Sequence, residues 1–74
     1  MNLIERITIE PGKRSGQPCV RRMRVTVSDV LELLADGLTP AEVVEQLPWL
    51  EPDDVRACLM YAAERMSHPT TLAQ

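Results

Sequence analysis

The chain has little of the side-chain chemistry on which most enzymes depend. Its 74 residues include one histidine, His68, two cysteines and no phenylalanine, and aromatic residues make up only 3%. Cys19 and Cys58 lie far apart and lack metal-ligand spacing, so we interpret them as reduced thiols, with Cys58 packed in a helix. His68 stands beside Pro69, where we expect an exposed and idle side chain. Because no nucleophile with a base, metal cluster or set of convergent carboxylates is visible, we predict no enzyme activity, catalytic residue, metal, cofactor or small-molecule substrate.

Long apolar runs and targeting segments are also lacking. No stretch has the ~20 apolar residues that a membrane-spanning helix requires, and no signal or transit peptide is apparent. We therefore expect a cytoplasmic protein with no membrane partner. Apolar residues make up 45% of the chain without any Pro/Gly/Ser-rich tract, which predicts a folded domain with an aliphatic core. A chain near this size buries only about 60% of its unfolded surface, so we expect help from a partner.

Basic residues are few beyond residue 27. Residues 1–27 contain six basic and two acidic side chains, a net charge of +4, whereas residues 28–74 contain two basic and nine acidic side chains, a net charge of −7. This asymmetry predicts a cationic N-terminal segment attached to an acidic helical body.

Residues 1–27 have the pattern of an N-terminal β-element. Apolar alternation and a turn signal at residues 10–12 predict a short strand within residues 3–9. A second strand is expected over residues 19–27, with Met23, Val25 and Val27 on one face and Arg22, Arg24 and Thr26 on the other. Two strands alone are seldom stable in water. We therefore expect a short β-hairpin packed on helices, or a β-ribbon whose strands are exchanged with a second subunit.

Residues 28–67 are expected to form a three-helix bundle, and residues 68–74 a flexible tail. Ser28 is the expected N-cap of a first helix over residues 29–36, and Gly37 supplies the left-handed residue that ends it. The predicted fold class is therefore mainly α, with the β-element at the N-terminus.

The second and third helices have clear boundaries. Thr39, Pro40 and Glu42 form a capping-box sequence that begins the second helix, and Pro48 ends it at about residue 47. Pro52 begins the third helix, which is expected to continue to about residue 66. Two helices joined by so short a turn predict a helix-turn-helix domain.

The third helix is apolar on nearly all sides in its middle. At about 100° per residue, one face carries the residues expected in the local core, which are Val55, Cys58, Leu59, Ala62 and Met66. Ala57, Met60 and Tyr61 lie on the other side, and an apolar face is normally covered. We therefore expect these three residues to contact a second copy, in a homodimer or higher oligomer, or a different protein; the alternative is that the strand layer covers them. Trp49, in the preceding turn, is expected to fill the core.

The acidic start of the third helix bears on nucleic-acid binding. Its first turn carries Glu51, Asp53 and Asp54, whose carboxylates repel phosphate, so we do not expect this helix to read DNA. The cationic segment is the better candidate for binding a protein or nucleic acid. Its predicted binding residues are Lys13, Arg14, Arg21, Arg22 and Arg24. The alternative is a solvated strand face that keeps the domain soluble.

Six short segments occur in an order and spacing that are specific only when taken together. They are Ile7-Thr8-Ile9-Glu10-Pro11, Gly16-Gln17-Pro18-Cys19-Val20-Arg21, Arg24-Val25-Thr26-Val27, Leu34-Ala35-Asp36-Gly37-Leu38-Thr39-Pro40-Ala41-Glu42, Leu47-Pro48-Trp49-Leu50 and Val55-Arg56-Ala57-Cys58-Leu59-Met60-Tyr61-Ala62. Over about residues 6–65 this series resembles the bacterial domain-of-unknown-function family 433. That family usually has paired glycines where this chain has Ser15-Gly16, and a Gly-Thr step where it has Arg22-Met23.

The resemblance implies a VapB-like antitoxin with a helix-turn-helix domain of the homeodomain-like class. The expected partner is a PIN-like ribonuclease toxin, which holds divalent metal with clustered carboxylates. An arginine directed into such a site would compete with the metal through bidentate pairing. The chain would then silence the nuclease, and it would also repress its own operon by binding operator DNA. The alternative is a stand-alone dimeric DNA-binding transcriptional regulator.

Overall fold

Within residues 2–67 the fold contains three α-helices and a short two-stranded antiparallel sheet, as the sequence predicts, together with two short 3₁₀ helices. The structure is a computed structural model that describes residues 2–67; the predicted tail over residues 68–74, with His68, lies outside them. The elements in order are the 3₁₀ helix η1 (Leu3–Arg6), β1 (Ile7–Thr8), the 3₁₀ helix η2 (Arg14–Gly16), β2 (Cys19–Val20), α1 (Val27–Ala35), α2 (Pro40–Gln46) and α3 (Pro52–Met66).

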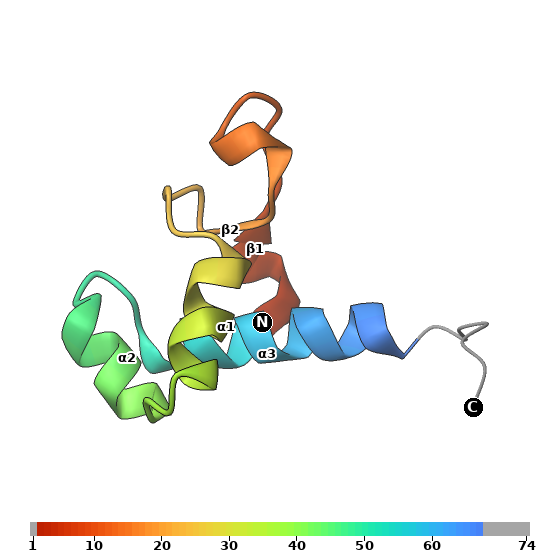
Figure 1. The fold of residues 1–74 in the computed structure, drawn as a ribbon. Coiled ribbons are helices and arrows are strands. Elements are labelled where there is room, and N and C mark those ends of the chain that lie inside the picture. The colour runs from red at the N-terminus through yellow and green to blue at the C-terminus, as the bar shows by residue number, and fades with distance from the viewer. Residues whose placement is uncertain (1, 68–74) are drawn as a thin grey trace.

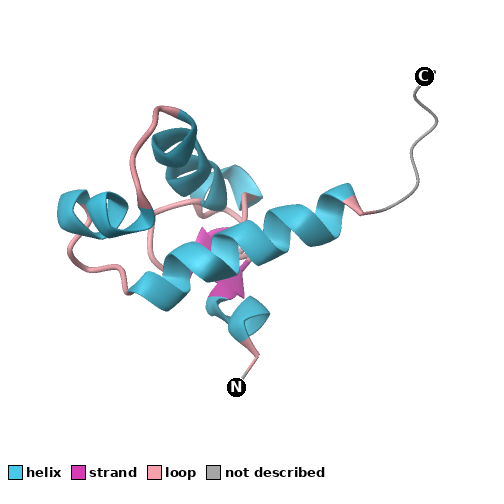
Figure 2. Ribbon diagram, turned by 90° about the horizontal axis from the view of Figure 1, so that it is seen from below, coloured by secondary structure: helices cyan, strands magenta, loops and turns pink. Residues whose placement is uncertain are grey.

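Helix α3 is the element on which the others pack. It is the longest helix, and η1, β1, α1 and α2 all contact it. Its C-terminal half extends beyond the other elements in both views of the ribbon (Figures 1 and 2). The molecule therefore has a packed end, where the helices and strands meet, and a helical projection.

Capping boxes begin the first two α-helices. In α1 the hydroxyl of Thr26 accepts a hydrogen bond from the Asp29 N–H at 2.9 Å, and the Asp29 carboxylate accepts one from the Thr26 N–H at 3.0 Å. The prediction of Ser28 as the N-cap is wrong by two residues, because Thr26 has an acidic partner three positions later and Ser28 has an apolar one. Helix α2 begins as predicted, with the same reciprocal bonds between Thr39 and Glu42 at 3.2 Å and 2.8 Å.

Gly37 ends α1 as the sequence predicts. Its φ of +105° is in the left-handed region, where glycine has no Cβ to clash. The Gly37 N–H donates to the Leu34 carbonyl at 3.0 Å and the Leu38 N–H to the Leu33 carbonyl at 3.2 Å. These two bonds form a Schellman motif, which turns the chain sharply toward α2.

The predicted second strand is wrong beyond its first residues. β2 pairs with β1 within the same chain, with Ile7 opposite Val20. The chain then reverses, because Arg21 and Arg22 have φ values of +44° and +65° and the Met23 N–H donates to the Val20 carbonyl at 2.7 Å. Two consecutive left-handed residues define the type I′ hairpin turn. We call residues 20–25 the arginine turn; it replaces the continuous strand expected over residues 19–27.

Arg22→Gly is expected to raise the free energy of unfolding by about 0.5–1 kcal/mol. A side chain at positive φ destabilises the folded state by roughly 1 kcal/mol or more, and glycine removes most of this strain. Glycine also increases the entropy of the unfolded chain, which offsets part of the gain. Urea denaturation measures the change. Arg24→Gly is the matched control, since Arg24 is also exposed but is not among the residues with positive φ, and this variant is expected to lose stability. A loss in both variants would contradict the strained turn.

The core lies between α3 and the elements around it. Its most buried residues are Val20, Val27, Val30, Val43, Leu50, Val55 and Cys58. Leu59 and Met66, which the sequence assigns to this core, are instead 44% and 76% exposed, and Ala57, which it assigns to an oligomer contact, is 0% exposed. The prediction is wrong for these residues because η1 and β1 cover a different side of α3 from the one expected. Trp49 is also exposed (52%), so it does not fill the core.

Candidate partner-binding surface

The Arg21 guanidinium is turned toward Asp54 of α3, although the Arg21 side chain is still 37% exposed. Its Nε lies 2.9 Å from Oδ1 of Asp54 and its Nη2 lies 2.7 Å from Oδ2, so the guanidinium binds the carboxylate with two nitrogens. The Asp54 side chain is fully buried. The same Nη2 donates to the backbone carbonyl of Trp49 at 3.0 Å, which ties the arginine turn to the turn before α3. The Arg21 guanidinium is therefore already paired within the chain, unlike the solvent-facing cation that the sequence predicts.

A second arginine binds Asp54 from η1. Arg6 Nη1 lies 3.0 Å from Asp54 Oδ1 and 2.7 Å from Glu51 Oε1. The Asp54 carboxylate also accepts the backbone N–H of Glu51 at 2.7 Å. We call Arg6, Arg21 and Asp54 the inner cluster; it joins η1, the arginine turn and the N-terminus of α3.

The inner cluster keeps Asp54 ionised. Burial by itself raises the pKa of a carboxyl group, but here the hydrogen bonds from Arg21, from the Glu51 N–H and from Arg6 outweigh it, and the pKa of Asp54 is lowered. The pKa of Arg21 is correspondingly raised, chiefly by its hydrogen bonds to Asp54.

Acid is expected to destabilise the domain through Asp54. Because its folded-state pKa is lowered, the folded chain binds fewer protons than the unfolded chain, so stability rises with pH in this range. The stabilisation of the folded state by ionised Asp54 is complete above the unfolded-state pKa of ~3.9. It is lost as the pH falls through the lower pKa of the folded state. Urea denaturation at a series of pH values should show a steeper loss below about pH 4 in the wild type than in Asp54→Asn. Parallel profiles would contradict a charged Asp54.

Arg22 and Arg24 lie on the outside of the arginine turn. Both residues are exposed, and within residues 2–67 neither side chain forms an ion pair. The backbone N–H of Arg22 donates to the hydroxyl of Thr8 at 2.9 Å, which fixes the turn against β1. Of the predicted binding residues, these two keep guanidiniums that can reach a partner.

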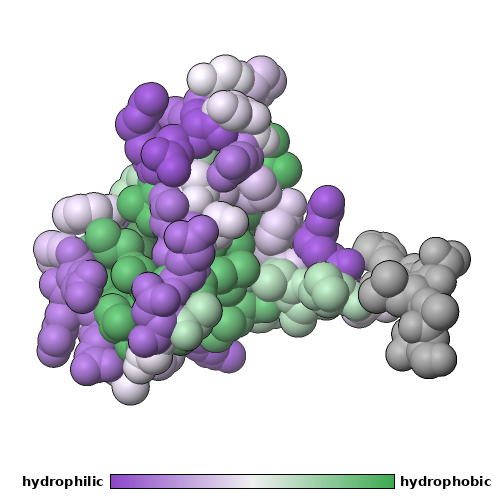
Figure 3. Space-filling view, viewed as in Figure 1, coloured by the Kyte–Doolittle hydropathy of each residue, from purple (hydrophilic) through white to green (hydrophobic). Residues whose placement is uncertain are grey.

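Lys13 and Arg14 lie at the start of η2, and carboxylates of the chain neutralise them in part. Lys13 Nζ donates to the backbone carbonyl of Arg22. It also lies 2.9 Å from Glu10 Oε1, and this contact with the ammonium lowers the pKa of Glu10. Arg14 Nη2 lies 3.5 Å from Asp29 Oδ2, and both side chains are exposed. Hydrophilic side chains cover this end of the molecule (Figure 3, top). The structure thus brings Lys13 to the arginine turn but leaves Arg22 and Arg24 as its unpaired charges within residues 2–67.

The predicted oligomer residues do not share one surface. Ala57 is buried, Met60 is 42% exposed, and Tyr61 is half-buried against the core. Ala57 cannot contact a second copy while η1 and β1 cover this side of α3.

The two thiols are buried. Cys58 is 0% exposed, and burial, with the nearby charge of Asp54, raises the pKa of its thiol to about 12. Cys19 is 1% exposed and lies 3.3 Å from the Gln17 carbonyl. Neither thiol is placed to act as a nucleophile.

In the described part of the chain no three His, Cys, Asp or Glu side chains are grouped as a metal site. No helix in this part has the length and apolar character needed to cross a bilayer.

Comparison with known proteins identifies the family. The crystal structure of a DUF433 member protein from Anabaena variabilis ATCC 29413 has a TM-score of 0.78 and 26% sequence identity. The match covers 82% of this chain and 60% of that one, so this chain spans less than two thirds of that protein's length. No functionally curated protein matches the chain. The family model described as a protein of unknown function, DUF433, matches residues 7–62, which include the whole arginine turn and Asp54. The chain therefore belongs to the DUF433 family.

Proposed function

We propose that this chain is an antitoxin, which binds and silences a PIN-like ribonuclease through Arg22 and Arg24. The observation that carries this proposal is the pair of exposed guanidiniums on the arginine turn, which have no ion-pair partner within residues 2–67. The family resemblance supplies the class of partner. A nuclease that holds metal with clustered carboxylates offers the planar anions that guanidinium binds with two nitrogens.

The arginine turn is held before any partner arrives, which favours binding. Arg21 joins it to Asp54, the Lys13 ammonium joins it to the neighbouring loop, and the Arg22 N–H joins it to Thr8. A pre-ordered segment loses less conformational entropy on association than a flexible one. The inner cluster thus has an indirect role, because it fixes the backbone that carries Arg22 and Arg24.

We propose that α2, the turn over residues 47–51 and α3 form a helix-turn-helix of the homeodomain-like class that serves as a scaffold. The first turn of α3 argues against base reading, because Glu51 and Asp53 have side chains that are 60% and 50% exposed. Their carboxylates would face the phosphates of a bound duplex. We also propose that the protein acts in the cytoplasm without catalysis or a cofactor.

Co-purification with the nuclease encoded beside it tests this proposal. Arg22→Glu and Arg24→Glu are each expected to weaken the complex at least about 10-fold, which corresponds to 1.4 kcal/mol, and to restore nuclease toxicity on co-expression. Arg56→Glu is the matched control, since the Arg56 side chain is 69% exposed on α3 and approaches Asp53 only to 3.9 Å. Equal weakening by all three variants, or no complex with the wild type, would contradict the proposal.

A stand-alone DNA-binding regulator is the second candidate, because an exposed basic turn can also follow a phosphate backbone. Arginine-to-lysine variants distinguish the DNA-binding regulator from the nuclease-binding antitoxin. Phosphate attraction depends mainly on charge, so Arg22→Lys and Arg24→Lys should still shift the chain's own promoter fragment, with steep salt dependence. Two-nitrogen pairing with a carboxylate is lost in lysine, so the same variants should weaken a nuclease complex. Operator binding by the antitoxin would give a shift in addition to the nuclease complex.

A further inference from the structure

Four apolar residues form a row on the C-terminal half of α3, and most of this row is open to solvent. Leu59 and Met66 are 44% and 76% exposed, Ala63 is exposed, and Ala62 is half-buried. Their spacing of three, four and seven residues places them on one face of the helix. The surface toward this end of α3 is pale green, or weakly hydrophobic, in Figure 3. We call these four residues the apolar row.

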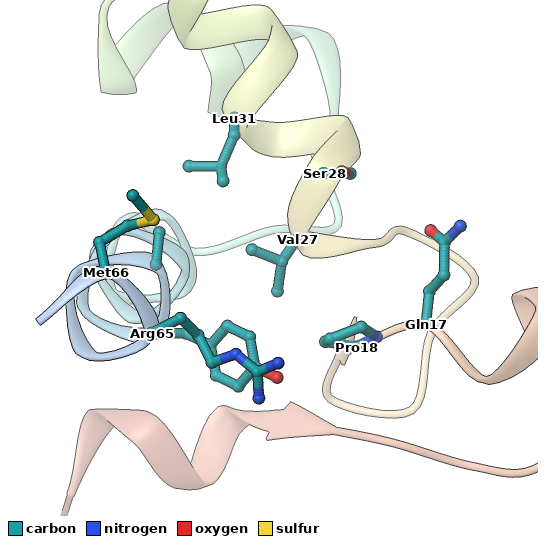
Figure 4. Close-up of a pocket in the computed structure, with 9 residues that line it drawn as sticks. Gln17, Pro18, Val27, Ser28, Leu31, Arg65 and Met66 are labelled. Atoms are coloured by element: carbon teal, nitrogen blue, oxygen red, sulfur yellow. The ribbon is translucent and has the colours of Figure 1, made fainter. Parts of the chain in front are cut away.

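An apolar groove runs beside this row. It has a volume of about 430 Å³ and lies between α1, α3 and residues 17–18. Val27 and Leu31 of α1 form one wall, Met66 and Arg65 of α3 face them, and Pro18 closes one end (Figure 4). Ala62 and Met66 belong to both the row and the groove, so the two form one continuous apolar surface.

We propose that a second copy of this chain covers this surface, with the two α3 helices antiparallel about a two-fold axis between Ala62 and Ala63. Along the apolar row the side chains are large, small, small and large, so their order of size is the same in both directions along the helix. Leu59 of one copy then faces Met66 of the other, and alanine faces alanine. A two-fold interface uses the same patch on both copies, so the patch must fit itself, and this row does. The alanines allow the helix axes to approach to ~8 Å.

The distribution of charge permits a copy of the same chain on this face. The net charge is −3, so two copies repel wherever their carboxylates meet. Among residues 2–67, no carboxylate lines the groove and Arg65 is its only charged lining residue. The Arg65 guanidinium lies 5.8 Å from the centre of the Tyr61 ring. Glu64 is turned roughly 150° away from the centre of the row. This face therefore lets two acidic chains meet without opposing their carboxylates.

The required area explains why the groove belongs to the interface. A stable complex typically buries ~800 Å² on each partner, and a row about 12 Å long cannot supply this alone. The groove walls add Pro18, Val27 and Leu31. Met60 is turned roughly 110° from the centre of the row, so it lies outside this interface. The inference is independent of the antitoxin proposal.

Sedimentation equilibrium of the purified chain tests the interface. The wild type is expected to be a dimer, and Met66→Glu and Leu59→Glu are expected to weaken it at least about 100-fold with an unchanged circular dichroism spectrum. Met60→Glu is the matched control, since it places the same charge at an exposed methionine on another face of the same helix, and it should remain dimeric. A monomeric wild type would overturn the proposal, as would a Met60→Glu variant that dissociates while Met66→Glu does not.

Cross-linking gives a second test that does not depend on the stability of a charged variant. Ala63→Cys, next to the two-fold axis, should form a disulfide-linked dimer under a mild oxidant. Met60→Cys, on the other face, should not. The native thiols of Cys19 and Cys58 are 1% and 0% exposed and do not interfere. Equal cross-linking at the two positions would contradict this arrangement.

Discussion

Asp54→Asn is expected to lower the free energy of unfolding by about 3–5 kcal/mol, the usual cost of removing one partner from a buried ion pair. The amide can still accept the Glu51 N–H, but it carries no charge. The guanidiniums of Arg6 and Arg21 then lose the anion that both of them bind. Domains are stable by only ~5–15 kcal/mol in total, so this loss would be a large share of the stability of so small a domain. Urea denaturation followed by circular dichroism measures this loss.

The neighbouring carboxylate provides the control. Asp53 is next to Asp54 in the first turn of α3, but its side chain is 50% exposed and approaches Arg6 and Arg56 only to 3.9 Å. Exposed pairs contribute little, so Asp53→Asn is expected to change stability by less than about 0.5 kcal/mol. If the two variants lose stability equally, Asp54 has no special structural role.

Arg21→Met is expected to lower the free energy of unfolding by about 2–3 kcal/mol. The substitution removes the two-nitrogen contact with Asp54 and the bond to the Trp49 carbonyl, while Arg6 remains to pair with the carboxylate. Arg21→Lys should recover part of this loss, since it keeps the charge but not the planar geometry. The same urea denaturation measures both variants.

A double-mutant cycle isolates the contact between the two side chains. Arg21→Met and Asp54→Asn together should destabilise less than the sum of the single changes, with a coupling energy of about 1–3 kcal/mol. Additive effects would mean that Arg21 and Asp54 do not act on each other, and the inner cluster would be contradicted.

Local signals in the sequence are enough for the helix boundaries. Thr39 and Glu42 form the predicted capping box, and Pro52 begins α3 where expected. The arginine turn has no such signal. A type I′ turn favours glycine and asparagine, and Arg21-Arg22 in an apolar alternation indicates a continuing strand. The family resemblance gives one indication of this turn. The Gly-Thr step that is usual in the family falls at Arg22-Met23, and Arg22 has a φ of +65°.

The inner cluster depends on contacts that no local pattern encodes. Arg6 is 48 residues from Asp54, and Arg21 is 33 residues from it. The charge asymmetry predicts correctly that basic side chains precede an acidic helical body, but composition cannot say which arginine turns inward. That choice follows from the backbone reversal at residues 21–22, which directs adjacent side chains to different sides. The exposed face of α3 could not be predicted for a similar reason, since it depends on where η1 packs.

The division of the arginines into an inner Arg21 and outer Arg22 and Arg24 is tested most directly by urea denaturation of Arg21→Gln, Arg22→Gln and Arg24→Gln side by side. Arg21→Gln is expected to lose about 2–3 kcal/mol, because a buried carboxylate loses a charged partner. Arg22→Gln and Arg24→Gln should each stay within about 0.5 kcal/mol of the wild type, as exposed substitutions usually do. Three equal losses, or a neutral Arg21→Gln, would contradict the account.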